Sequence, residues 1–119
     1  QARQERELRQ LLARKEAEAA RAAASARQKA LNEYIARIQY KVKSNWILPQ
    51  DIQGNPEAIF LVVQLPTGEV LSTRLVKSSG NPAYDTAVER AILKSSPLPL
   101  PASRSDFSRV LELRFRPRD

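Results

Sequence analysis

Residues 58–77 constrain the fold of this chain more than any other stretch of its sequence. Two runs rich in β-branched, aliphatic and aromatic residues, 58–65 and 70–77, flank a short turn that contains Pro and Gly, and this pattern predicts a β-hairpin. Phe60 and Val62 lie on one face of the first run. The opposite face carries Ile59, Leu61, Val63 and Leu65. A strand that is apolar on both faces is typical of the centre of a sheet, and a hairpin alone is not stable. The rest of the chain must therefore cover and extend this hairpin.

The segments on either side of the hairpin each predict a helix. Before it, apolar residues recur at helical spacing from Leu31 to Val42, and Pro49 prevents the helix from continuing further. After it, Asn81 suits an N-cap and is followed by Pro at the first helical position. The second helix is therefore predicted over residues 82–95.

The end of the chain predicts a third strand over residues 108–115, where Leu111, Leu113 and Phe115 alternate with more polar residues. From residue 31 the order is helix, strand, strand, helix, strand, which fits a small two-layer α+β domain. Short connections and a central first strand predict a three-stranded antiparallel sheet of order 2-1-3. Both helices are expected to pack on the face that bears the sheet's larger apolar set.

Residues 1–30 differ from this domain in composition. They are rich in Ala, Arg, Glu and Gln, contain no Gly or Pro, and have no large apolar residue between Leu12 and Leu31. We expect an extended, polar, exposed helix that acts as a spacer, roughly 45 Å long at 1.5 Å per residue. Since the chain begins inside this helix without Met, we interpret it as a fragment of a longer protein. The predicted division is a spacer at residues 1–30 and a domain at residues 31–119, and no transmembrane span or signal peptide is indicated.

The composition excludes many catalytic and metal-binding sites. The 119 residues include no Cys, His or Met, which excludes disulfides, most transition-metal sites and nearly every nucleophilic triad. Lys77, Ser78, Ser79 and Asp85 could form a Ser/Lys arrangement, but Ser-Ser-Gly before a helix is better explained as a turn. We predict no catalytic residue, no cofactor and no metal site, and hence no enzyme.

The positive charge keeps nucleic-acid binding as an alternative. The net charge is +7; residues 1–30 contribute 8 − 4 = +4, and the remainder contributes 12 − 9 = +3. Basic and acidic residues are interleaved rather than gathered in a stripe, and only Phe60 and Phe115 lie on predicted strands. A sheet with few exposed aromatic residues is a poor platform for stacking bases. We therefore predict protein partners and no nucleic acid.

Several motifs around the hairpin are similar to those of a known family. They are Trp46-Ile47-Leu48-Pro49, the strand–Pro-x-Gly–strand pattern of residues 60–70, the Ser-Ser-Gly-Asn-Pro-Ala-Tyr-Asp run that ends at Asp85, and Pro97 and Pro99 before the last strand. On these motifs residues 31–116 resemble the C-terminal domain of the TolA family, within the wider TonB/TolA C-terminal superfamily. The implied fold is a three-stranded antiparallel sheet with helices on one face. The chain departs from some members, which have a disulfide here, because it has no Cys.

The resemblance implies a periplasmic domain of an inner-membrane-anchored protein in the Tol–Pal cell-envelope system of a Gram-negative bacterium. It implies TolB and the outer-membrane lipoprotein Pal as partners, with TolQ and TolR reached through the missing N-terminal anchor. It also implies that group A colicins and the minor coat protein of filamentous phage use this domain. A TonB-like energy-transducing domain is an alternative, although TonB spacers are typically Pro-rich and residues 1–30 contain no Pro.

The last strand is the predicted binding site. Order 2-1-3 leaves residues 70–77 and 108–115 as the sheet edges, which carry unpaired N–H and C=O groups. No following element covers the second of these edges, and we predict that a partner segment adds to it as a further strand. The predicted partner-binding residues are Arg109, Val110, Leu111, Glu112, Leu113, Arg114 and Phe115. The Arg residues favour acidic partners; alternatively, these charges serve only to prevent edge-to-edge aggregation.

Overall fold

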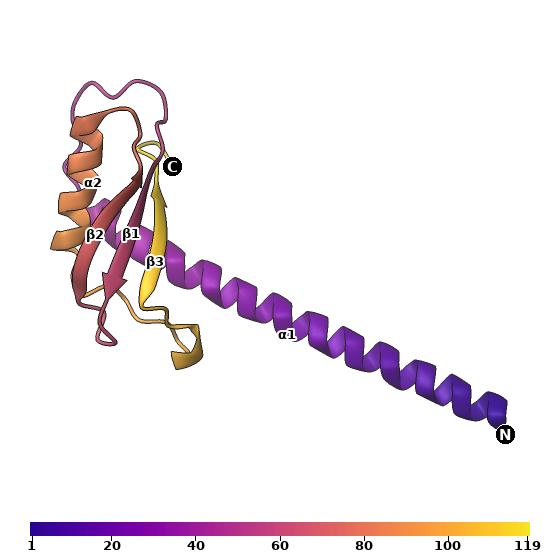
Figure 1. Cartoon of the computed structure of the whole chain (residues 1–119). Helices are drawn as coiled ribbons and strands as arrows, with labels where there is room; N and C mark the ends of the chain where they lie inside the picture. The colour runs from indigo at the N-terminus through magenta and orange to yellow at the C-terminus, as the bar shows by residue number, and fades with distance from the viewer. The chain divides into compact units, whose positions relative to one another are not determined.

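The computed structural model describes all residues of the chain, and each predicted helix and strand is present in it (Figure 1). The elements are, in order, helix α1 (Ala2–Asn45), strands β1 (Ala58–Gln64) and β2 (Val70–Lys77), helix α2 (Pro82–Lys94), a short 3-10 helix η1 (Arg104–Asp106) and strand β3 (Val110–Phe115). The 3-10 helix is an element that the sequence patterns do not predict. Strand β3 begins at Val110 rather than at Ser108.

Helix α1 runs without interruption through both segments that the sequence predicted as helical. The chain divides into two compact units, Gln1–Asn32 and Glu33–Asp119. In the first unit, residues 1–29 are all exposed, because this part of the helix has almost no large apolar side chains to bury. Neither α1 nor α2 contains a stretch that is apolar enough to cross a membrane. The role of residues 1–30 as a spacer stays a prediction.

The sheet confirms the predicted order, with β1 in the centre between β2 and β3 and both pairs antiparallel. The pairing of β1 with β3 is uninterrupted from Ala58 opposite Phe115 to Val63 opposite Val110. The pairing of β1 with β2 is different, because its register shifts twice, after Ile59 and again after Val63. Such irregularities increase the local twist of a strand pair. The β3 side of the sheet is therefore the more regular one.

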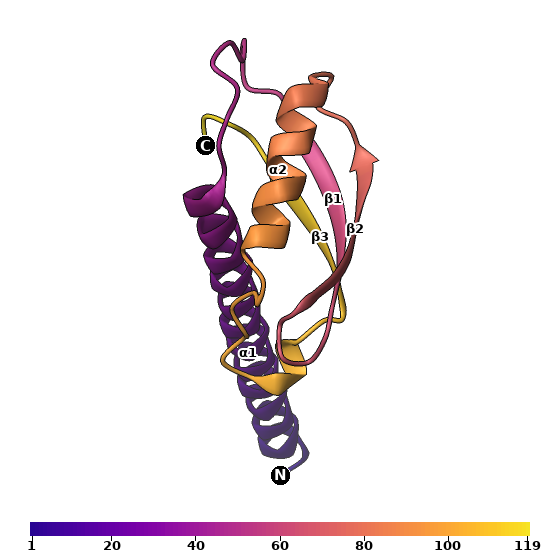
Figure 2. The same ribbon diagram turned by 90° about the vertical axis from the view of Figure 1, so that its left-hand side faces the viewer.

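The core lies between one face of this sheet and the two helices. Its buried apolar residues are Tyr34, Ile38 and Val42 of α1, Ala58, Phe60 and Val62 of β1, Tyr84, Val88, Ala91 and Ile92 of α2, Leu98, and Leu111, Leu113 and Phe115 of β3. Strand β3 decides which face is covered, because Phe60 lies directly opposite Leu113 and the side chains of β3 add to the Phe60 side. Leu61 and Val63, on the other face, are partly exposed. Figure 2 shows α2 and the C-terminal part of α1 on the same side of the sheet.

The Ser-Ser-Gly segment before α2 forms a cap for that helix. Asn81 is the N-cap, and its side chain accepts hydrogen bonds from the backbone N–H groups of Ala83 and Tyr84. The Asp85 carboxylate accepts hydrogen bonds from the hydroxyl groups of Ser78 and Ser79. These contacts satisfy donors at the start of the helix and place a negative charge where the helix dipole favours one. They account for the serines and Asp85 as a structural turn.

The substitution Gly68→Ala is expected to lower the free energy of unfolding by about 3 kcal/mol. Gly68 has φ of +91°, and an added Cβ would collide with the backbone oxygen of Leu98, whose N–H donates to the Gly68 carbonyl at 2.8 Å. Gly54→Ala is the matched control, since Gly54 has φ of +72° but no atom within 4 Å of the added Cβ; its cost is about 1 kcal/mol. Chemical denaturation measures both, and equal losses would contradict the clash with Leu98.

Candidate functional site

The outer side of strand β3 carries backbone groups that no other strand of the chain pairs (Figure 1). The N–H of Gln64 donates to the carbonyl of Arg109 at 2.9 Å, which marks these residues as a hydrogen-bonded pair. Bonded and non-bonded pairs alternate along an antiparallel ladder, so Leu111 and Leu113 also direct their backbone groups toward β1. The outward N–H and C=O groups, named here the β3 edge, are those of Val110, Glu112 and Arg114.

The side chains of the predicted site divide between the core and the surface. Leu111, Leu113 and Phe115 are only 5%, 0% and 1% exposed, so they hold β3 against the helices and are not available to a partner. The side chains of Arg114 and Glu112 are 64% and 53% exposed. Val110 is also exposed, as is Arg109, which lies just before the strand. Six of the seven predicted residues therefore form β3 and Arg109 directly precedes it; four of the seven side chains, those of Arg109, Val110, Glu112 and Arg114, are exposed.

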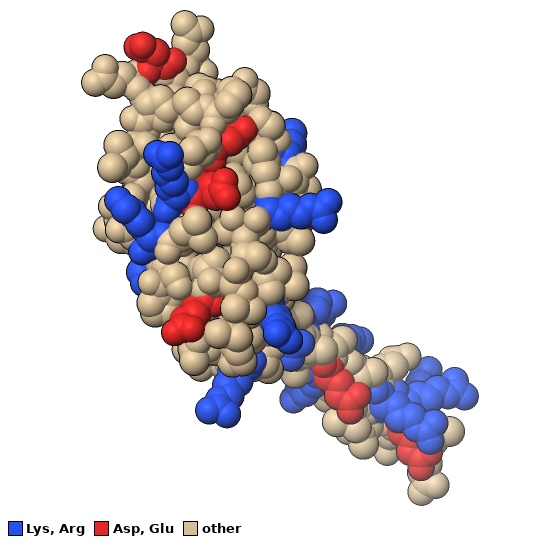
Figure 3. All heavy atoms as spheres, turned by 60° about the vertical axis from the view of Figure 1, so that its left-hand side comes forward, with Lys and Arg blue, Asp and Glu red and all other residues tan.

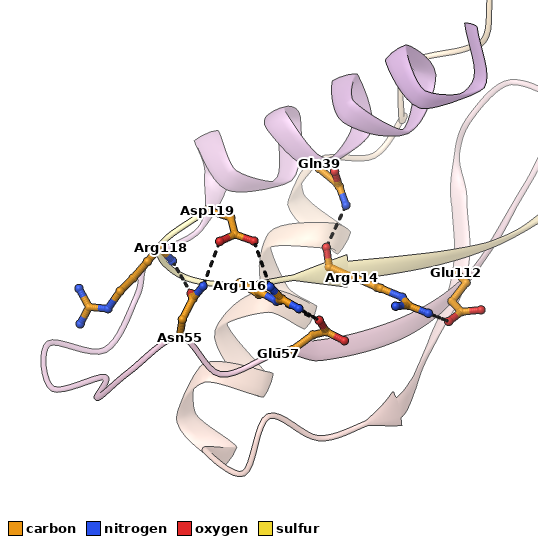
Figure 4. A network of polar contacts seen from close by, with 8 residues as sticks. All are labelled: Gln39, Asn55, Glu57, Glu112, Arg114, Arg116, Arg118 and Asp119. Carbon is orange, nitrogen blue, oxygen red and sulfur yellow. Dashed lines mark hydrogen bonds and ion pairs between the residues drawn. The ribbon is translucent and has the colours of Figure 1, made fainter. Parts of the chain in front are cut away.

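Two side chains occupy acceptors at the ends of the β3 edge. The hydroxyl of Ser108 donates to the carbonyl of Val110 at 2.8 Å, and Nε2 of Gln39 in α1 donates to the carbonyl of Arg114 at 2.9 Å (Figure 4). No group of the chain pairs with the N–H of Val110, the N–H of Arg114 or either backbone group of Glu112. Glu112 is thus the residue at which both a donor and an acceptor of the edge are free.

A fully buried side chain fixes the start of β3. Nε2 of Gln64 donates to the carbonyl of Ser108 at 2.8 Å and to the hydroxyl of Tyr34 at 3.1 Å. Gln64 is 0% exposed, and the two hydrogen bonds of its Nε2 group offset part of the cost of burying the amide, whose Oε1 has no partner. Its two bonds join the central strand, helix α1 and the residues that lead into β3. The N-terminal end of the β3 edge is therefore held in place by the core.

A polar network fixes the other end of β3 (Figure 4). Nη2 and Nε of Arg116 lie 2.6 and 2.9 Å from Oε2 of Glu57. Asn55 donates to the Asp119 carboxylate at 2.9 Å and accepts from the backbone N–H of Arg118 at 3.0 Å. Glu57 and Asn55 belong to the loop between α1 and β1. With both ends anchored, the middle of β3 presents a preorganised row of backbone groups.

Residues 31–115 match the family model described as TonB C terminal. The chain belongs to the TonB C-terminal family. Two solved structures are similar to it. A solution NMR structure of TolAIII bound to a peptide derived from the N-terminus of TolB has 23% sequence identity, covers 71% of this chain and 73% of the other, and has a TM-score of 0.62. The NMR structure of the Helicobacter pylori TonB C-terminal domain has 21% identity, coverage of 70% and 88%, and a TM-score of 0.51. At these identities the two structures show a shared fold.

A search of curated protein sequences found no match. The family match confirms the resemblance to the TonB/TolA C-terminal superfamily that the motifs of residues 46–99 indicated.

In this TonB C-terminal domain, the arginines along β3 differ in how firmly they are paired. Arg116 is committed to Glu57, while Arg114 approaches Glu112 at 3.6 Å with both side chains mostly exposed, an arrangement that contributes little to stability. Arg109 takes part in no ion pair within the chain. Two cationic side chains, those of Arg109 and Arg114, therefore flank the free backbone groups of Glu112 and remain available to an acidic partner.

The sequence analysis did not identify the side chains that shape this edge. Gln39 lies 75 residues from Arg114, on a helix with many polar residues, and nothing in its local sequence distinguishes it. Ser108 was included in the predicted strand but ends up before it as a cap. Such contacts depend on how elements that are far apart in the sequence pack together, and the residue spacing within a helix or strand does not predict them.

The ion pair that anchors β3 predicts a loss of stability in acid. The hydrogen bond from Arg116 lowers the pKa of Glu57 from its ordinary value of 4.5. A carboxylate with a lowered folded-state pKa contributes stability above its unfolded-state pKa, and this contribution is lost as the pH falls through the folded-state value. Below about pH 4.5 the Tm of the wild type should fall more steeply than that of Glu57→Gln, and the two should converge. Thermal unfolding between about pH 6 and pH 3 measures this, with Glu69→Gln as the control. Parallel profiles for the wild type and Glu57→Gln would contradict it.

Proposed function

We propose that this chain is a non-enzymatic protein-interaction module that binds an extended partner segment along the β3 edge. The observation that carries the proposal is the free donor and acceptor pair of Glu112 in a strand whose two ends are anchored. A backbone segment that pairs there extends the sheet by one strand, and its side chains on the open face of the sheet lie beside those of Val110, Glu112 and Arg114. The solved structure of TolAIII with a TolB peptide supports peptide binding by this fold.

The second edge of the sheet, that of β2, is the less suitable one. Its pairing with β1 is irregular at two places, and such irregularities make an edge harder to extend with a further strand. Helix α2 also lies close to it, since Thr73 of β2 and Glu89 of α2 are within hydrogen-bond distance at 3.4 Å. Because β3 pairs regularly with β1, the outer edge of β3 has a better geometry for the addition of a partner strand.

The proposed setting is the Tol–Pal system. TolB is the first partner to test, because a TolB N-terminal peptide is the ligand in the TolAIII structure. Pal, group A colicins and the minor coat protein of filamentous phage are further proposed partners, and TolQ and TolR would act through an anchor outside this chain. We place the domain in the periplasm, where the exposed helix of residues 1–30 would separate it from the inner membrane. A bridge between the two membranes needs such a spacer.

Two alternatives have different support. A TonB-like energy-transducing role is supported by the family description itself and by the similarity to the Helicobacter pylori domain. Nucleic-acid binding has less support, because Phe60 and Phe115 are both buried in the core and cannot stack on bases. On the face shown in Figure 3, basic and acidic side chains are interspersed. Neither the burial of these aromatic rings nor the mixed charges on this face favour nucleic-acid binding.

The test of strand addition is a proline at an outward-facing amide. Glu112→Pro removes a free N–H and places a ring on the edge, where Pro is tolerated because that N–H has no partner in the sheet. Binding of a peptide from the TolB N-terminus, measured by isothermal titration calorimetry, should weaken by at least about tenfold. Glu112→Ala keeps the N–H and is the matched control. A folded Glu112→Pro protein with unchanged affinity would contradict strand addition at β3.

A second substitution tests how far the added strand extends. If it reaches Arg114, it must displace the amide of Gln39 from the Arg114 carbonyl. Gln39→Ala removes this competing donor. The same peptide should then bind about fivefold more tightly, because one net hydrogen bond contributes roughly 1 kcal/mol. Unchanged affinity in a protein with unaltered thermal unfolding would limit the added strand to residues 110–112.

A further inference from the structure

A groove separate from the β3 edge lies between α2 and the segment that follows α1. It has a volume of about 640 Å³, and no residue of β3 lines it. One wall is formed by Ile47, Leu48 and Pro49, and the other by Ala83, Ala87 and Ala91 of α2. Because these alanines have small side chains, an apolar side chain from another molecule can approach α2 closely.

The wall of this groove exposes an apolar side chain that the fold does not use. Ile47 is 78% exposed, the largest fraction among the exposed large hydrophobic residues of the chain. Its neighbour Trp46 does pack against the core, with its ring in edge contact with the rings of Tyr84 and Phe115. The backbone at Ile47 is therefore held by Trp46, and its side chain is presented to the groove.

The rim of the groove is basic and has no counter-charge. Arg90 and Lys94 lie one turn apart on α2 and both line the groove, whereas no Asp or Glu does. Neither of the two takes part in an ion pair. The acidic residues of α2 are engaged elsewhere, Asp85 by the serines before the helix and Glu89 beside Thr73 of β2. Like charges at this spacing on a helix repel each other, and an anion bound between them would relieve the repulsion.

We propose that this groove binds an acidic, amphipathic segment of a partner protein. Apolar side chains of that segment would pack against Ile47 and the alanines of α2, while its carboxylates would pair with Arg90 and Lys94. The N-terminal helix of a second copy does not have this chemistry, because residues 1–30 carry a net charge of 8 − 4 = +4. The proposal is independent of strand addition, since the two surfaces share no residue.

The test uses two synthetic peptides of about 14 residues with Leu at helical spacing. One has Glu at the polar positions, and the other has Lys there instead. The fluorescence of Trp46, the single Trp of the chain, and the backbone amide shifts of the full chain report binding. The acidic peptide is expected to bind with amide shifts at Ile47, Leu48 and residues 83–94, and the basic peptide is expected not to bind.

Substitutions then separate a specific site from general attraction. Arg90→Ala with Lys94→Ala should weaken binding of the acidic peptide by at least about tenfold, and so should Ile47→Asp. Arg74→Ala with Lys77→Ala, which removes the same charge from β2, should leave the affinity unchanged. Equal weakening by both double variants, equal binding of both peptides, or shifts confined to β3 would each overturn the proposal. So would a dimer, detected by analytical ultracentrifugation, that Ile47→Asp dissociates, because the groove would then be an interface between copies.

Discussion

The antiparallel pairing of β1 with β3 is the interaction on which the rest of the structure depends. It joins the first strand of the domain to the last one, and it places the three buried side chains of β3 beside Phe60 and Val62. Without β3 the two faces of β1 would be similarly apolar, and the helices would have no strong preference for either. With β3 in place, one face is decisively the larger apolar surface, and burying it against α1 and α2 is the dominant favourable contribution to folding.

The same pairing creates the exposed edge that we propose as the binding site. A strand that pairs on one side must leave its alternate backbone groups facing outward, and a small sheet has no further strand to cover them. The chain limits the risk of aggregation in two ways. Side chains of Ser108 and Gln39 occupy the end acceptors, and charged residues line the exposed positions. What remains open is a short segment around Glu112, and it is this segment that we propose as the binding site.

The order of the strands could be predicted from the sequence because it rests on local patterns. The apolar run of residues 58–65, the alternation in residues 108–115, the N-cap at Asn81 and the break at Pro49 each depend on a few neighbouring residues. The contacts that finish the site are of another kind. Gln39 reaches Arg114, and Arg116 reaches Glu57, across separations of 75 and 59 residues. These pairs form only after the sheet and helices have packed, so that no periodicity in the sequence identifies them.

The two proposed surfaces make different demands on a partner. The β3 edge offers backbone groups, so it is expected to select mainly for an extended segment whose own backbone groups are free to pair. The groove beside α2 offers side chains, so it is expected to select for apolar and acidic side chains. Because Trp46 packs against Phe115, the wall of the groove and the end of β3 rest on the same core residue. A substitution that alters the packing of Phe115 is therefore expected to disturb both surfaces.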